Sequence, residues 1–138
     1  MNIDAIQNGI VIDHIPAGAG MKLYALLGLD ALDCSVAIIK NAHSNKDGKK
    51  DIIKIDAEIP LNFDVIAYLA PNAKINIIRN GKLLEKRDAT LPKTLTNVII
   101  CKNPRCITKT EQELDQIFRL TDPEQRIYRC IYCETKAN

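Results

Sequence analysis

Four of the five cysteines of this chain lie in its last third, in two short pairs. Four residues separate Cys101 from Cys106, and two residues separate Cys130 from Cys133. A closely spaced thiolate pair can turn both sulfurs toward one ion, and two such pairs supply the four ligands of a closed tetrahedral zinc site. The spacing therefore predicts one structural Zn²⁺ per chain, bound by these four cysteines.

Two disulfides or a catalytic zinc ion are the alternatives for this cluster. The N-terminal sequence has no basic region followed by a long apolar stretch, so we expect a cytoplasmic protein whose thiols stay reduced. A catalytic zinc keeps a position open for water, whereas four sulfurs close the site. We therefore expect a structural metal, whose binding contributes on the order of 10 kcal/mol to the folding of this short region.

Composition limits the function classes only weakly. The chain has 138 residues, 46% of them hydrophobic, and no apolar run approaches membrane-spanning length, so we expect no membrane partner. Its net charge of +2 is too small to indicate nucleic-acid binding by itself. With two Phe and no Trp, the core is expected to be aliphatic.

Hydrophobic periodicity predicts an alternation of strands and helices in the first part of the chain. A β-branched run at 10–15 reads as a strand that Pro16 ends, and Leu23, Leu26 and Leu27 recur at helical spacing. The following pattern predicts strands at 35–39 and 53–57. The polar stretch at 41–50 between them is expected to be a solvated loop.

The next segment predicts a second helix and a hairpin. Asn62 is a suitable cap for a helix over 62–70, which Pro71 ends, and Asn80-Gly81 favours a two-residue turn between strands. The order β-α-β-β-α-β with an extra strand predicts an α+β fold. We expect a ferredoxin-like α/β sandwich, in which two helices cover one face of an antiparallel sheet.

The pattern breaks around 88–96, where a linker is expected. Strands at 97–100 and 126–129 are predicted to lead into the two cysteine pairs, which gives a small β-rich four-cysteine zinc domain. The predicted domains are residues 1–93 and 94–138.

The residues available for catalysis are few, and we expect no enzyme activity. His43 lies in a polar stretch, where a solvated histidine is expected, and Cys34 has no neighbouring His or helix start in the sequence that would activate it as a nucleophile. The Gly18-Ala19-Gly20 segment lacks the third glycine of a dinucleotide loop, because Leu23 stands there. No GxxxxGK[ST] loop occurs.

Several segments together resemble a known family. They are residues 11–16 (VIDHIP), residues 50–55 (KDIIKI), Ala70-Pro71 followed by Asn76, and the four paired cysteines. In this order and over nearly the whole chain, the sequence resembles the regulatory subunit of aspartate carbamoyltransferase.

The resemblance implies a non-catalytic subunit of the enzyme complex that acts in pyrimidine biosynthesis. It implies an N-terminal allosteric domain that binds the effectors CTP and ATP, and a zinc domain that contacts the catalytic chain, expected through 107–129. It also implies a homodimer of regulatory chains associated through a sheet edge. The nucleotide-binding residues that it implies are Asp4, Ala5, Ile6, Val11, Asp13, His14, Lys54, Asn76, Ile78, Leu83 and Lys86.

Spacing alone gives these residues an ordinary structural explanation, since Lys54 and Lys86 alternate with apolar neighbours as on any half-exposed sheet. A second function is also compatible with the zinc spacing. A free-standing zinc-ribbon protein that binds nucleic acid could use the basic residues near the cysteine pairs, which are Arg105, Lys109, Arg126 and Arg129.

Overall fold

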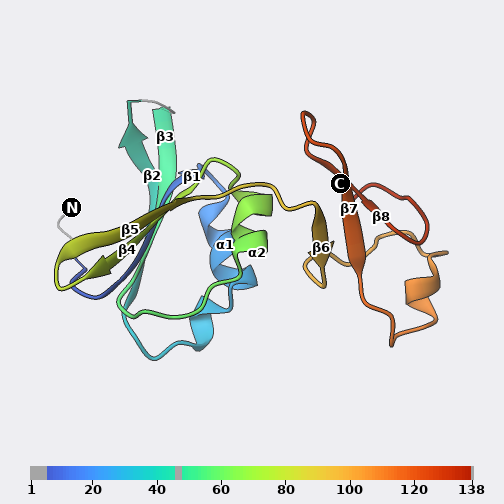
Figure 1. Ribbon diagram of the computed structural model, residues 1–138, viewed down its shortest axis with the longest axis horizontal. Helices are drawn as coiled ribbons and strands as arrows, with labels where there is room; N and C mark the ends of the chain where they lie inside the picture. The colour runs from blue at the N-terminus through green and yellow to red at the C-terminus, as the bar shows by residue number, and fades with distance from the viewer. Residues whose placement is uncertain (1–5, 46–47, 138) are drawn as a thin grey trace. The chain divides into compact units, whose positions relative to one another are not determined.

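The chain divides into two compact units, Met1–Thr90 and Leu91–Asn138 (Figure 1). The structure is a computed structural model, and it describes residues 6–45 and 48–137. None of the helices in these two ranges has the length and apolar character needed to cross a membrane.

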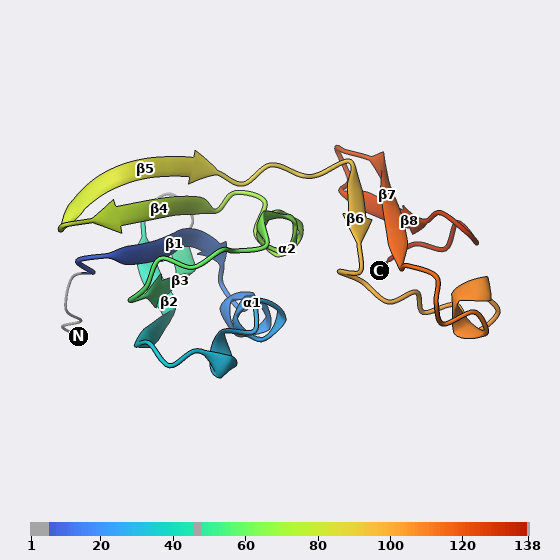
Figure 2. The same ribbon diagram turned by 60° about the horizontal axis from the view of Figure 1, so that its bottom comes forward.

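The first unit is a five-stranded sheet covered on one face by two helices. Every strand pair is antiparallel, and the strand order is β2-β3-β1-β4-β5. Figures 1 and 2 show α1 and α2 side by side against one face of the sheet. The predicted α+β class is confirmed. The elements are β1 (Gly9–Pro16), α1 (Gly20–Leu26), η1 (Leu29–Ala31), β2 (Val36–Ser44), β3 (Gly48–Ile55), α2 (Phe63–Leu69), β4 (Lys74–Arg79) and β5 (Lys82–Asp88).

The core of this unit is aliphatic and follows the two-residue period of the strands. Alternate isoleucines point to the helices and are fully or nearly buried, and the residues between them point to the opposite face, which carries no helix. The helices bury small and branched side chains against this layer. The buried apolar side chains of the sheet and helices include Ile10, Ile12, Ile53, Ile55, Ile75, Leu23, Val65 and Ile66.

Local signals place α2 and the β4–β5 hairpin as predicted. The Asn62 side chain accepts hydrogen bonds from the backbone N–H groups of Asp64 (3.1 Å) and Val65 (3.4 Å), which caps the first turn of α2. Asn80 and Gly81 have φ angles of 55° and 75°, as a two-residue hairpin turn between antiparallel strands requires.

A buried carboxyl group organises the loop that precedes α1. Asp51 on β3 is fully buried, and its side chain accepts hydrogen bonds from the backbone N–H groups of Gly18 (3.0 Å), Gly20 (3.0 Å) and Asn41 (2.9 Å). A Cβ at position 20 would lie 2.8 Å from Asp51 Oδ2, so only glycine allows this approach. Asp51 therefore ties β2 and the start of α1 to β3.

The polar stretch at 41–50 does not form the solvated loop that we expected. β2 extends to Ser44 and β3 begins at Gly48, with His43 opposite Lys49 across the pair. The prediction was wrong because hydrophilic side chains do not prevent strand formation here. The residues on both sides of the turn belong to a long hairpin, and their backbone groups pair with each other. A bulge between Ile39 and Ala42 accommodates the Asp51 contact at Asn41.

The second unit contains a small three-stranded antiparallel sheet of order β6-β7-β8. Its elements are β6 (Thr94–Thr96), η2 (Ile107–Lys109), β7 (Ile117–Asp122) and β8 (Ile127–Cys130). Its buried side chains include Leu95, Phe118 and Tyr128, and the Tyr128 hydroxyl donates a 2.6 Å hydrogen bond to the Pro92 carbonyl.

The strand predicted at 97–100 is wrong, and β7 was not predicted. β6 was not predicted either, because it lies within the linker expected at 88–96. Asn97 has a φ of 57°, which ends β6, and its side chain contacts Asp115 (3.0 Å) and the backbone N–H of Gln116 (2.9 Å). The residues after Asn97 therefore leave the sheet before they reach Cys101. The strand predicted at 126–129 corresponds to β8.

Candidate functional sites

The four paired cysteines converge on one point in the second unit. Their Sγ atoms all lie within 4.8 Å of one another, and the closest pairs are Cys101 with Cys133 (3.6 Å) and Cys106 with Cys130 (3.7 Å). These separations exclude disulfides, whose sulfurs are about 2.05 Å apart. Four sulfurs about 2.3 Å from a central zinc would be about 3.8 Å apart, so the cluster fits a tetrahedral metal ion.

Neighbouring side chains form hydrogen bonds with three of the four cysteines. The Thr108 hydroxyl donates to Cys106 Sγ (3.2 Å), and Thr135 Oγ1 lies 3.2 Å from Cys133 Sγ. Gln116 accepts a 3.0 Å hydrogen bond from the Cys101 backbone N–H. Such contacts fix the orientation of metal ligands before the ion binds.

The thiols differ in their tendency to ionise when no ion is present. Burial raises the pKa of the Cys101 thiol to about 12. Burial also opposes ionisation of Cys133, but hydrogen bonds from the side chain and backbone of Thr135 lower its pKa to about 6. A bound cation is needed to stabilise four thiolates together, so metal uptake displaces protons and weakens as the pH falls.

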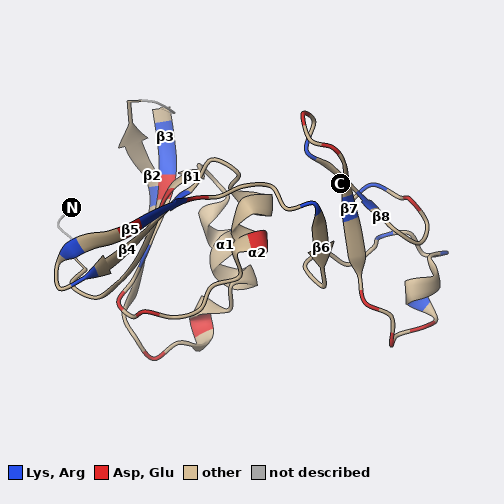
Figure 3. Ribbon diagram, viewed as in Figure 1, with Lys and Arg blue, Asp and Glu red and all other residues tan. Residues whose placement is uncertain are grey.

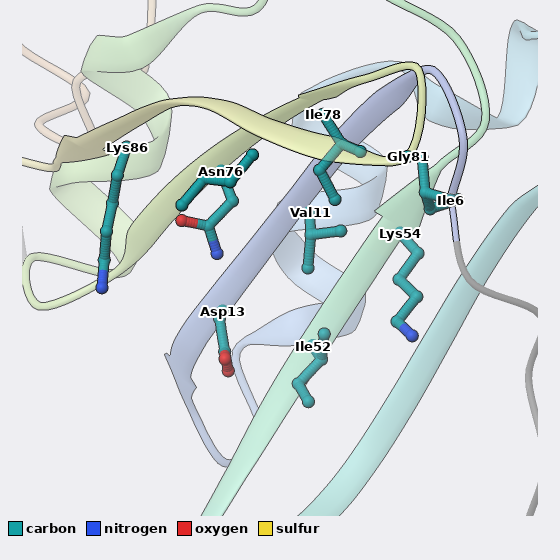
Figure 4. Close-up of a pocket in the computed structure, with 10 residues that line it drawn as sticks. Ile6, Val11, Asp13, Ile52, Lys54, Asn76, Ile78, Gly81 and Lys86 are labelled. Carbon is teal, nitrogen blue, oxygen red and sulfur yellow. The ribbon is translucent and has the colours of Figure 1, made fainter.

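The helix-free face of the first unit carries a pocket of about 480 Å³ (Figure 4). Its floor is a row of directly paired residues across four strands, in the order Lys54, Val11, Asn76 and Lys86. Adjacent strands are about 4.8 Å apart, so the row extends about 14 Å with a lysine at each end. The full lining is Ile6, Val11, Asp13, Ile52, Lys54, Asn76, Ile78, Gly81, Leu83 and Lys86.

Charged and polar groups in the pocket are arranged around an apolar centre. Asp13 forms a 2.9 Å ion pair with Lys50. Partial burial opposes ionisation of Asp13, but this contact and the backbone N–H of His14 lower its pKa. Asn76 Oδ1 is buried and has no hydrogen-bond partner among the described residues, so a donor from a ligand would satisfy it.

The pocket contains most of the residues that the family resemblance implies. Of that set, Ile6, Val11, Asp13, Lys54, Asn76, Ile78, Leu83 and Lys86 line it together. Asp4 and Ala5 lie outside the described residues. His14 sits at a bulge with a φ of 57° and lines a separate hollow of about 350 Å³ with Lys49 and Asn72.

Sequence reasoning missed Ile52 as a lining residue and Lys50 as the partner of Asp13. The signal for Ile52 is its position two residues before Lys54 on the same strand, since alternate residues share a face. The ion pair between Lys50 and Asp13 could not be predicted from strand alternation, because it depends on the bulge in β1 between Ile12 and Ile15.

Sequence comparison assigns both units to one family. The family model described as "Aspartate carbamoyltransferase regulatory chain, allosteric domain" matches residues 1–90, and the corresponding "metal binding domain" matches residues 93–138. The chain belongs to the family of aspartate carbamoyltransferase regulatory chains. The resemblance found in the sequence is thereby confirmed, and the pocket and the cysteine cluster each fall within one of the two matched domains.

Relatives named as aspartate carbamoyltransferase regulatory chains match over almost the whole sequence. The protein from Clostridium botulinum is 48% identical over 134 residues, which are 97% of this chain and 92% of the relative. The protein from Clostridium tetani is 47% identical over 135 residues (97% and 94%). The protein from Bifidobacterium longum is 42% identical over 137 residues (99% of each).

Proposed function

We propose that this chain is the non-catalytic regulatory subunit of an aspartate carbamoyltransferase and acts in the cytoplasm in pyrimidine biosynthesis. Residues 1–93 bind CTP or ATP, and residues 94–138 bind Zn²⁺ and attach the chain to the catalytic chain. The observation that carries this proposal is the pocket with a lysine at each end, in a unit that matches the family's allosteric domain.

The pocket offers a suitable partner for each part of a nucleoside triphosphate. Lys54 and Lys86 provide cationic donors for phosphates, and the Asp13 carboxylate can accept hydrogen bonds from ribose hydroxyls. Ile78 and Leu83 give the base an apolar surface. Cytosine and adenine both carry an exocyclic amino group. This group could donate a hydrogen bond to the buried Asn76 Oδ1, which has no donor among the described residues.

Removing either lysine of the pocket should weaken nucleotide binding. Lys54→Met and Lys86→Met each delete a charge-assisted hydrogen bond to phosphate, so we expect the CTP affinity to fall about 10- to 100-fold. Calorimetric titration of the zinc-loaded chain with CTP and ATP measures this. Lys22→Met, at an exposed position on α1, is the matched control and should bind as the unmodified chain does.

Unchanged CTP affinity in both pocket variants would contradict the assignment of this pocket. Titration with an RNA oligonucleotide over a range of salt concentrations tests the nucleic-acid alternative, because polynucleotide binding falls steeply with salt. Tight, salt-sensitive RNA binding without CTP binding would favour a free-standing zinc-ribbon protein.

The second unit exposes an apolar cluster around its metal site, which we propose as the main contact with the catalytic chain. Ile100, Ile107, Ile131 and Tyr132 are each adjacent in sequence to a metal-site cysteine, and their exposed fractions are 74%, 49%, 44% and 37%. The convergence of the four sulfurs brings these side chains to one region. Exposed apolar clusters of this kind commonly mark protein interfaces.

We also propose that two regulatory chains pair through the outer edge of β2. The two free edges of the sheet differ, because β5 is charged along most of its length, whereas residues 36–39 at the start of β2 are uncharged and apolar. Unprotected apolar edges favour strand pairing between chains. Ile38→Lys should convert a dimer to a monomer in sedimentation experiments, and a variant that stays dimeric would exclude this edge.

A further inference from the structure

The face of the small sheet that points away from the metal site carries a row of positively charged side chains. Arg119 on β7 lies directly opposite Arg129 on β8. Arg129 is also paired with Lys136 by an isolated antiparallel backbone bridge. Thr94 on β6 lies opposite Arg119 and completes the row. We call Arg119, Arg129 and Lys136 the basic row. Figure 3 shows basic segments on β7 and β8.

The basic row and the metal site lie on opposite faces of this sheet. Cys130 is paired with Phe118, and both are buried together with Tyr128. Because successive side chains of a strand point to opposite faces, Arg119 and Arg129 project from the other face. Arg119 and Lys136 are exposed and Arg129 is half-buried. The basic row is therefore a surface distinct from the apolar cluster around the metal.

The row has no acidic partner among the residues that the structure describes. In residues 6–45 and 48–137, none of its three side chains forms an ion pair with a carboxylate, although Arg129 donates a 3.0 Å hydrogen bond to the Glu134 carbonyl. Like charges directly opposite each other on neighbouring strands are destabilising. The pairs Arg119–Arg129 and Arg129–Lys136 are both of this kind. An external anion bound over them would reduce the repulsion between their charges.

We propose that the basic row binds carboxylate groups on an acidic surface of the catalytic chain, as a second contact besides the apolar cluster. The proposal rests on the proposed function. Arginine forks suit bidentate binding of carboxylates. A single-stranded nucleic acid is a poorer fit, because such ligands need aromatic stacking surfaces, and Phe118 and Tyr128 are buried on the opposite face.

The test compares capture of the catalytic chain by zinc-loaded variants over a range of salt concentrations. Arg119→Gln combined with Arg129→Gln should weaken binding about tenfold at low salt and flatten its salt dependence, because two screened charge contacts are lost. Arg119→Glu with Arg129→Glu should weaken it about 100-fold. Lys22→Gln with Lys93→Gln, two exposed lysines outside the row, removes equal charge and should have little effect.

The outcomes separate this proposal from the proposed function. If the unmodified chain captures the catalytic chain and the row variants, still folded by circular dichroism, bind with equal affinity and salt slope, the basic row is not a contact. If the unmodified chain does not bind the catalytic chain, the proposed function fails and this proposal fails with it. Tighter binding of RNA than of the catalytic chain through the same two arginines would also overturn it.

Discussion

Removal of the metal will unfold residues 91–138 and leave the first unit folded. The apolar core of the second unit centres on Leu95, Phe118 and Tyr128, and a core this small cannot offset the conformational entropy of the segment. Metal binding is expected to provide on the order of 10 kcal/mol of folding free energy. Displacing the ion with an organic mercurial, or Cys130→Ser, should therefore make this segment sensitive to proteases.

Limited proteolysis with mass spectrometry locates the cleavage sites, and metal analysis of the intact chain identifies the ion. Cys34→Ser is the matched control, since Cys34 lies outside the cluster and should retain the metal and the resistance. The unfolded segment should also lose its affinity for the catalytic chain. Protease resistance of residues 91–138 after complete removal of the metal would refute a structural role for the ion.

Among the substitutions of polar side chains considered in the first unit, Asp51→Ala is expected to cause the largest loss of stability. The change leaves the backbone N–H groups of Gly18, Gly20 and Asn41 without their acceptor, in a region that is partly or fully buried. Breaking a buried network of this kind costs about 3–5 kcal/mol, which is a large part of the stability of a small domain.

Urea unfolding of the zinc-loaded full chain, followed by circular dichroism, measures the effect. Asp51→Asn keeps the shape and one acceptor oxygen, so its loss should be intermediate. Asp56→Ala removes an exposed carboxyl group just after the same strand and should change the stability by less than about 1 kcal/mol. An Asp51→Ala chain as stable as Asp56→Ala would show that these hydrogen bonds contribute little.

The fold was predictable where local chemistry and hydrophobic period agree. The isoleucines of β1 and β3, the Asn62 cap and the Asn80-Gly81 turn act within a few residues, so the sequence alone places them. The polar half of the β2–β3 hairpin was missed, because its strands are held by pairing with each other rather than by burial. The role of Asp51 was missed because its partners at Gly18 and Gly20 are distant in sequence.

The two candidate sites also differ in how far the sequence alone could predict them. The spacing of the four cysteines was sufficient to predict their convergence. The pocket depends on the register of four strands, which places Lys54, Val11, Asn76 and Lys86 in one row. That register cannot be read from the alternation of any single strand, and only the family resemblance brought these residues together in the sequence analysis.

Nucleotide binding to this chain is expected to control the activity of a separate catalytic chain. The most direct measurement is the carbamoyl-transfer rate of the catalytic chain assembled with the zinc-loaded regulatory chain, at subsaturating aspartate, with and without CTP or ATP. Allosteric couplings of about 1–3 kcal/mol change affinities about 5- to 150-fold, so we expect a clear nucleotide response. Lys54→Met should shift this response to about 10- to 100-fold higher nucleotide concentration without loss of assembly. An assembled enzyme that ignores both nucleotides, or a regulatory chain that turns over substrate alone, would contradict the account.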